Sequence, residues 1–189
     1  EFFAKMDAAN VDLKAFTDDF YHRVCAARLD PVLDTLRYLR HETDVWFEIT
    51  TLLIPGKNDS EAEIDAETSW IRDTLGPDVP LHFTAFHPDY KMLDVPRTPA
   101  ATLSRARQIA MANGLNFVYT GNVHDAEGGT THCPCCGSAV IVRDWYEIRT
   151  YRLDEGGRCL SCHAQLPGVF DGPMEHWGRR RLPVIVAGR

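Results

Sequence analysis

The chain has 189 residues, of which 44% are hydrophobic, so it is large enough to bury the core of one globular domain with a small appendage, and it has no apolar run long enough to cross a membrane. Its 27 acidic and 20 basic residues give a net charge of −7, and 19 of the acidic but only 12 of the basic residues lie within 1–123. This balance provides no basic face for nucleic acid, and the run Arg179, Arg180 and Arg181 is interpreted as a short solvated stretch.

The first strand is predicted at residues 11–16, where residue types alternate and Asp12 and Lys14 share a face. Two opposite charges on one face need a polar setting, either a solvated ion pair on an edge strand or a functional site. The chain begins with Glu1, and residues 1–6 resemble the end of a helix, so we expect it to start inside a larger domain.

Strand and helix patterns then alternate. Residues 45–54 are hydrophobic enough to predict a strand buried on both faces, and Ser60 with Glu63 has the spacing of a capping box for a helix that ends at Gly76. The other predicted elements are helices opening at Asp30 and Thr98, and strands at 81–86 and 116–119.

This repeat predicts an α/β fold in which parallel strands are joined by crossover helices. Four strands are too few to close a barrel, so they form part of an open sheet or of a barrel whose first half is missing. In both architectures functional residues gather at the carboxyl ends of the strands. Polar residues gather at those ends, which are Asp12 with Lys14, residues 50–54, His87 with Asp89, Tyr90 and Lys91, and residues 120–122.

Two C-x-x-C turns near the end of the chain have the spacing of a zinc ribbon. We expect Cys133, Cys136, Cys159 and Cys162 to form a closed four-sulfur site with a structural role. Short strands are predicted between the turns, at 139–142 and 145–148.

Three alternatives remain for these turns. The first turn also contains Cys135, which is either spare or replaces a ligand in a shifted register. The second turn continues into His163, which gives the C-x-x-C-H pattern of haem attachment. Four thiolates also hold iron as well as zinc. With four cysteines on a metal, Cys25 and Cys135 stay unpaired, which favours a cytoplasmic, reducing compartment.

The predicted organisation has four parts. Residues 1–123 form the strand–helix repeat, 124–130 a polar linker, 131–170 the ribbon, and 171–189 an extended tail.

Several motifs resemble the C-terminal part of the AmmeMemoRadiSam system radical SAM enzymes, which are relatives of the pyruvate formate-lyase activating enzymes. These motifs are DAANVDLKAF at 7–16, ITTLLIPG at 49–56, HFTAFHP at 82–88 and YTGNV at 119–123, followed by the ribbon.

The resemblance implies the C-terminal part of a partial (β/α)6 TIM-like barrel followed by a small zinc ribbon. It further implies an enzyme that uses a 4Fe-4S cluster and S-adenosylmethionine to generate a 5′-deoxyadenosyl radical, with a protein or peptide as its target. Asp12, Lys14 and His87 match the family's contacts to S-adenosylmethionine. Thr50 stands where the activating enzymes carry an arginine and is given no ligand role.

The chain departs from the family in a second respect, because none of its six cysteines has the C-x-x-x-C-x-x-C spacing of the cluster loop. We therefore expect a fragment that is inactive alone. The alternative function is a non-catalytic scaffold whose ribbon binds a partner protein or nucleic acid.

Overall fold

The computed structural model describes residues 2–170; the tail predicted at 171–189 lies outside the described residues. The chain divides into two compact units, Glu1–Gly128 and Gly129–Arg189, which are described separately below. None of the described helices is both long and apolar enough to span a bilayer.

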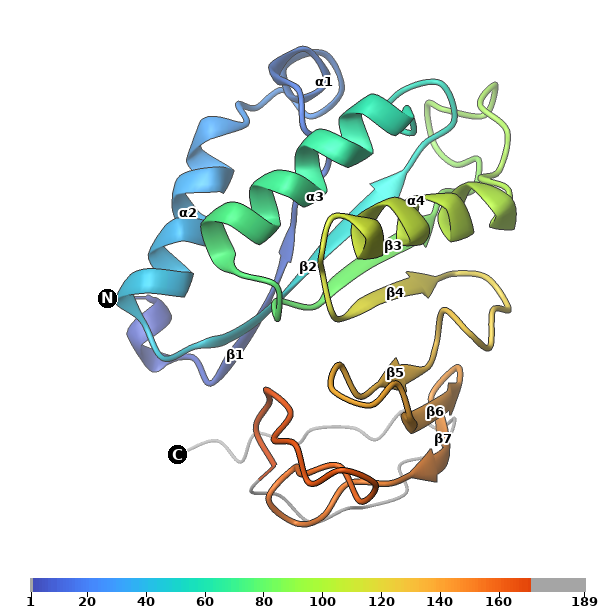
Figure 1. Ribbon diagram of the computed structural model, residues 1–189. Helices are drawn as coiled ribbons and strands as arrows, with labels where there is room; N and C mark the ends of the chain where they lie inside the picture. Colours follow the sequence, from blue (N-terminus) through green and yellow to red (C-terminus); the bar gives the residue numbers. More distant parts are fainter. Residues whose placement is uncertain (1, 171–189) are drawn as a thin grey trace, which may run out of the picture. The chain divides into compact units, whose positions relative to one another are not determined.

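The first unit is built on a four-stranded sheet in the order β1-β2-β3-β4, with all neighbours parallel (Figure 1). This confirms the predicted α/β fold with a parallel sheet. The strands are β1 (Ala8–Asp12), β2 (Trp46–Leu53), β3 (Leu81–Ala85) and β4 (Val118–Gly121), and the helices are η1 (Phe3–Lys5), α1 (Asp18–Val24), α2 (Asp30–Glu42), α3 (Glu61–Leu75) and α4 (Ala100–Ala112).

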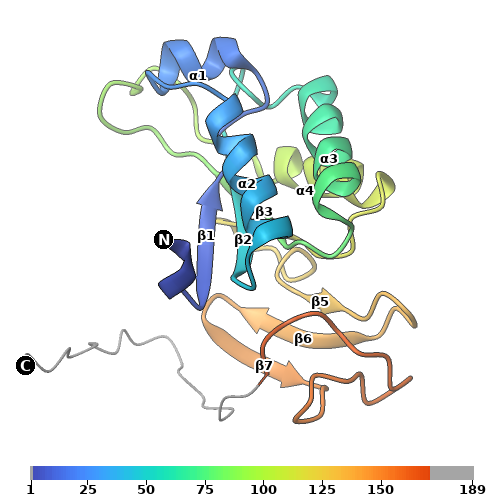
Figure 2. The ribbon, with the colours of Figure 1, turned by 90° about the vertical axis from the view of Figure 1, so that its left-hand side faces the viewer.

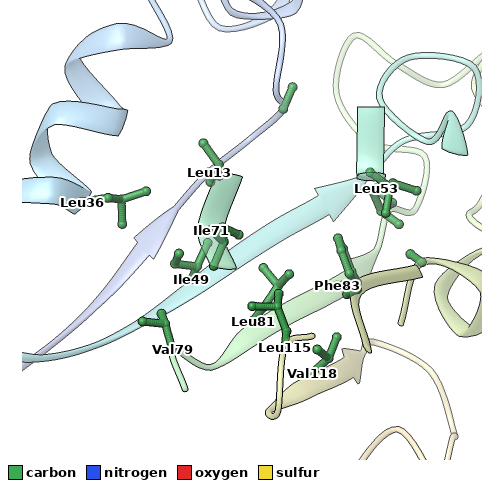
Figure 3. Close-up of a cluster of buried hydrophobic side chains, with 14 of the residues drawn as sticks. Leu13, Leu36, Ile49, Leu53, Ile71, Val79, Leu81, Phe83, Leu115 and Val118 are labelled. Atoms are coloured by element: carbon green, nitrogen blue, oxygen red, sulfur yellow. The ribbon is translucent and has the colours of Figure 1, made fainter. Parts of the chain in front are cut away.

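The three longer helices, α2, α3 and α4, lie on the same face of the sheet (Figures 1 and 2). Side chains of alternate strand residues point into the layer between this face and the helices, as period-two geometry requires. The core there includes Leu36, Ile49, Ile71, Leu81 and Phe83, each fully buried (Figure 3).

β2 corrects the prediction of a strand buried on both faces. Its side chains alternate between buried and partly exposed along its whole length. Phe47, Ile49, Thr51 and Leu53 are the buried ones. The remaining four point to the opposite face of the sheet, here called the second face.

β1 also differs from its prediction. Pairing with β2 begins at Ala8 and ends at Asp12, so Lys14 follows the strand instead of lying within it. The chain then turns into α1, which the sequence did not indicate. Thr17 caps this helix by accepting a hydrogen bond from the backbone N–H of Phe20.

The second unit contains a three-stranded antiparallel sheet in the order β5-β6-β7. Its strands are β5 (Thr131–His132), β6 (Ala139–Asp144) and β7 (Glu147–Tyr151). The second predicted strand of this unit is misplaced, because Trp145 and Tyr146 form the turn of the β6–β7 hairpin and Trp145 has a φ of 55°. The buried residues of this unit include Val140, Leu153, Leu166, Cys133 and Cys159.

Candidate ligand-binding edge and candidate metal centre

Asp12 and Lys14 form an ion pair where β1 ends. Lys14 Nζ lies 2.8 Å from Asp12 Oδ2, and the two side chains are 42% and 52% exposed. An ion pair as exposed as this contributes on the order of 1 kcal/mol or less to folding stability. Both charges are therefore accessible to a bound molecule, and little stability is lost if a ligand shares them.

The backbone of Lys14 is held more firmly than its side chain. Its N–H donates to Tyr21 Oη at 3.0 Å, and its carbonyl accepts from Asn58 Nδ2 at 2.7 Å. Both partners are buried, and they come from α1 and from the turn between β2 and α3. Sequence reasoning missed both residues.

His87 lies beyond β3, at the same carboxyl-terminal edge of the sheet. Its side chain is exposed, with Nδ1 3.3 Å from the carbonyl oxygen of Pro88. The preceding residue, Phe86, is held by buried Thr98. The Oγ1 of Thr98 accepts from the Phe86 N–H at 3.0 Å and donates to the Leu53 carbonyl at 2.6 Å. Thr98, twelve residues after Phe86, thus closes the base of the loop that carries His87.

The second face carries a polar network that the sequence analysis also missed. Glu48 Oε2 lies 2.7 Å from His82 Nε2, and the His82 ring stacks on Tyr119 with 5.0 Å between ring centroids. Asn10 donates to Thr50 Oγ1 at 3.0 Å. The available signal was the period-two spacing of polar residues within otherwise apolar strands.

Strand register places this network beside the ion pair. Asp12 is aligned with Thr50, Thr50 with His82, and His82 with Tyr119, so one row of residues crosses all four strands. Asp12 and His82 are two strand spacings apart, about 10 Å. That distance is within the span of one small ligand.

The four cysteines predicted as metal ligands come together in the second unit. Their sulfur atoms all lie within 4.8 Å of one another, with Cys133 and Cys162 3.6 Å apart and Cys136 and Cys159 3.8 Å apart. A tetrahedral site with Zn–S bonds of about 2.3 Å places its sulfurs about 3.8 Å apart. The donor set and its spacing therefore fit a zinc or iron ion. Cys135 is exposed and lies outside this group.

The two turns share one hydrogen-bond pattern. The N–H of Cys133 donates to the Ser138 carbonyl at 2.9 Å, and the carbonyl of Cys133 accepts from the Gly137 N–H at 2.8 Å. Cys159 repeats both bonds, with Ala164 and His163, at the same two distances. Gly137 and His163 occupy equivalent positions, with φ values of 71° and 62°. His163 thus closes a turn, which accounts for it without haem.

Proton affinities within the sulfur group are unequal. Hydrogen bonds from the side chain and backbone of Ser138 lower the pKa of Cys136 to about 6, and the backbone N–H groups of Ser161 and Cys162 lower the pKa of Cys159. A backbone hydrogen bond at Ala164 acts to lower the pKa of Cys162, but the neighbouring sulfurs and burial outweigh it and raise that pKa to about 12. Four adjacent thiolates repel one another, and a bound cation removes that penalty.

This chain resembles one curated protein in sequence and a solved domain in structure. No protein-family model matches the chain. An uncharacterized protein of Methanocaldococcus jannaschii (MJ0808) is 44% identical over 166 residues, which are 87% of this chain and 49% of that protein. The chain therefore spans about half the length of this curated relative.

A domain of a pyruvate-formate lyase-activating enzyme from Bacteroides vulgatus has a similar structure. The TM-score is 0.53 at 19% identity, over 61% of this chain and 68% of that one. At this level of identity the likeness establishes a shared fold, an α/β fold with a parallel sheet like that of the activating-enzyme domain.

Proposed function

We propose that this chain is the C-terminal portion of a radical S-adenosylmethionine enzyme related to the activating enzymes. The observation that carries the proposal is the placement of Asp12, Lys14 and His87 at one edge of a parallel sheet. Crossover helices on a single face are typical of β/α barrels, whereas doubly wound sheets carry helices on both faces. The fold shared with an activating-enzyme domain supports the same proposal.

Charge complementarity supports S-adenosylmethionine as the ligand. Its amino-acid moiety carries a carboxylate and an ammonium group, and its ribose carries hydroxyls. Lys14 Nζ supplies a cation for the carboxylate, and Asp12 supplies an acceptor for the hydroxyls. We assign His87, on the loop after β3, as a third contact to the same ligand.

The cysteines of this chain do not fit the 4Fe-4S cluster of the family. Four of them form a group whose sulfur atoms are spaced for a single ion, and the remaining two, Cys25 and Cys135, lack the cluster-loop spacing. We therefore assign the cluster ligands to a part of the longer protein outside this chain. This chain's own contribution is to bind and orient the nucleoside and its amino-acid group.

We assign the second unit a structural or docking role as a zinc ribbon, and a protein or peptide as the target of the enzyme. A four-sulfur site has no open position for substrate, so the metal stabilises the fold of the unit. We place the enzyme in the cytoplasm, where unpaired Cys25 and Cys135 remain reduced.

The experiment is a binding titration of S-adenosylmethionine with the full-length protein carrying its cluster. Each of Asp12→Ala, Lys14→Ala and His87→Ala removes a polar contact and is expected to weaken binding roughly ten- to a hundredfold. Lys5→Ala is the control and leaves affinity unchanged, because Lys5 precedes β1 and lies on the amino-terminal side of the sheet. Unchanged binding in all three variants would leave the scaffold function as the better account.

A further inference from the structure

The segment that follows β1 leaves the sheet, so its backbone polar groups need other partners. Leu13 N–H still reaches the Thr50 carbonyl at 3.0 Å. Beyond it, side chains take over: Tyr21 and Asn58 bind the two polar backbone atoms of Lys14, and Glu63 Oε1 accepts from Phe16 N–H at 2.8 Å. Side chains from α1, from the turn after β2 and from α3 thus hold this short segment.

The bond at Glu63 corrects the predicted capping box. Ser60 Oγ accepts from Glu63 N–H at 3.3 Å, as that motif requires. The reciprocal bond is replaced, because the Glu63 carboxylate binds the Phe16 N–H instead. The side chain that the motif assigns to its own helix therefore stabilises the Lys14 segment.

Asn58 is the central residue of this arrangement and is only 2% exposed. Its Nδ2 donates to the carbonyls of Lys14 and Leu52, at 2.7 and 2.9 Å, and its Oδ1 accepts from Ile54 N–H at 2.7 Å. It thereby ties the end of β2 to the segment after β1. A substitution leaves buried backbone groups unpaired, which shifts the segment or lets water enter.

Tyr21 completes the arrangement from α1. Its ring is 3% exposed, and burial raises the pKa of its hydroxyl to about 12, while the bond from Lys14 N–H acts in the opposite direction. The hydroxyl therefore stays neutral and accepts the Lys14 N–H. Because Tyr21 and Asn58 approach from different elements, the Lys14 backbone is unable to shift without breaking one of these two partly buried hydrogen bonds.

We propose that Tyr21 and Asn58 are positioning residues that fix the Lys14 ammonium toward the carboxylate of S-adenosylmethionine. The inference rests on the proposed function, because it takes Lys14 as the carboxylate partner. A lysine side chain has several rotatable bonds, so an error in its backbone position is carried to Nζ. The two hydrogen bonds to its backbone reduce that error, which lowers the entropic cost of binding.

The test compares two ligands on the full-length protein. S-adenosylmethionine has the amino-acid carboxylate, whereas 5′-methylthioadenosine has the same nucleoside but lacks the whole amino-acid moiety and the sulfonium charge. Tyr21→Phe and Asn58→Ala are expected to weaken binding of the first roughly tenfold, the lower end of the range expected for Lys14→Ala, and to leave binding of the second unchanged. Tyr38→Phe and Asn116→Ala are the matched controls and change neither affinity.

The outcomes separate this inference from the proposed function. If Lys14→Ala leaves S-adenosylmethionine binding unchanged, the proposed function itself is wrong at this residue. If Lys14→Ala weakens binding but Tyr21→Phe does not, the positioning role is refuted while the proposed function stands. Equal loss of both ligands shows a purely structural role and also overturns the inference. Tyr21→Phe removes one oxygen atom, so it decides the question even if Asn58→Ala fails to fold.

Discussion

A buried carboxyl group between α3 and β2 makes the stability of the first unit depend on pH. Glu67 is 2% exposed, and its Oε1 accepts a hydrogen bond from Thr51 Oγ1 at 2.5 Å. Burial raises the pKa of Glu67 to about 8, the Thr51 bond acts to lower it, and Glu63 raises it further. The folded protein therefore favours the neutral acid far above the usual pKa of a glutamate.

The sign of the effect follows from proton binding. Between the unfolded pKa of 4.5 and the folded pKa of about 8, the folded state holds a proton that the unfolded state has lost, so stability falls as pH rises. The stabilising contribution is fully present below pH 4.5 and lost as pH rises through about 8. At about 1.4 kcal/mol per pKa unit, the loss between about pH 5 and about pH 8.5 is on the order of 4 kcal/mol.

Glu67→Gln keeps the shape of the side chain and removes the titration. Urea unfolding of wild type and variant, at about pH 5 and about pH 8.5, is expected to show the variant gaining relative stability at the higher pH by roughly that amount. Glu61→Gln, on the exposed first turn of the same helix, is the control and shows no comparable pH dependence. A stability difference between Glu67→Gln and wild type that is equal at both pH values would refute the reasoning.

The remaining predictions concern the second unit. Elemental analysis should find one tightly bound ion per chain, most simply zinc, retained by Cys135→Ser and lost from Cys136→Ser; the reverse result would show that the ligand set is wrong. A non-glycine residue at positive φ costs about 1–2 kcal/mol, so thermal unfolding should show that His163→Gly stabilises the metal-loaded unit by about 1 kcal/mol and that Gly137→Ala destabilises it by about 1–2 kcal/mol. Nothing lies within 4 Å of a Cβ built on Gly137, so a much larger loss there would point to a cause other than backbone strain.

Local signals in the sequence were sufficient to predict the sheet and the cysteine group. Pro31 in the first turn of α2, and Ser60 and Gly76 around α3, mark helix ends through their own backbone chemistry. The paired C-x-x-C spacing likewise brings its sulfurs close whatever the surrounding fold. Such signals depend only on residues near one another in the chain.

The surroundings of Lys14 were beyond sequence reasoning for the opposite reason. Asn58 contacts a backbone carbonyl 44 positions away, and no local pattern encodes that partner. α1 is only seven residues long, too short for a clear helical stripe, so Tyr21 received no assignment. The row from Asp12 to His82 appears only once strand register is known, because a shift of one residue would turn His82 toward the helices.

The most direct test of the proposed function is formation of 5′-deoxyadenosine from S-adenosylmethionine by the full-length protein, reconstituted and reduced under anaerobic conditions. We expect 5′-deoxyadenosine to form with the full-length protein, to fall sharply with Lys14→Ala, and not to form with this chain alone. A full-length protein that carries a reduced 4Fe-4S cluster and binds S-adenosylmethionine yet forms no 5′-deoxyadenosine would contradict the proposal, as would 5′-deoxyadenosine formation by this chain alone.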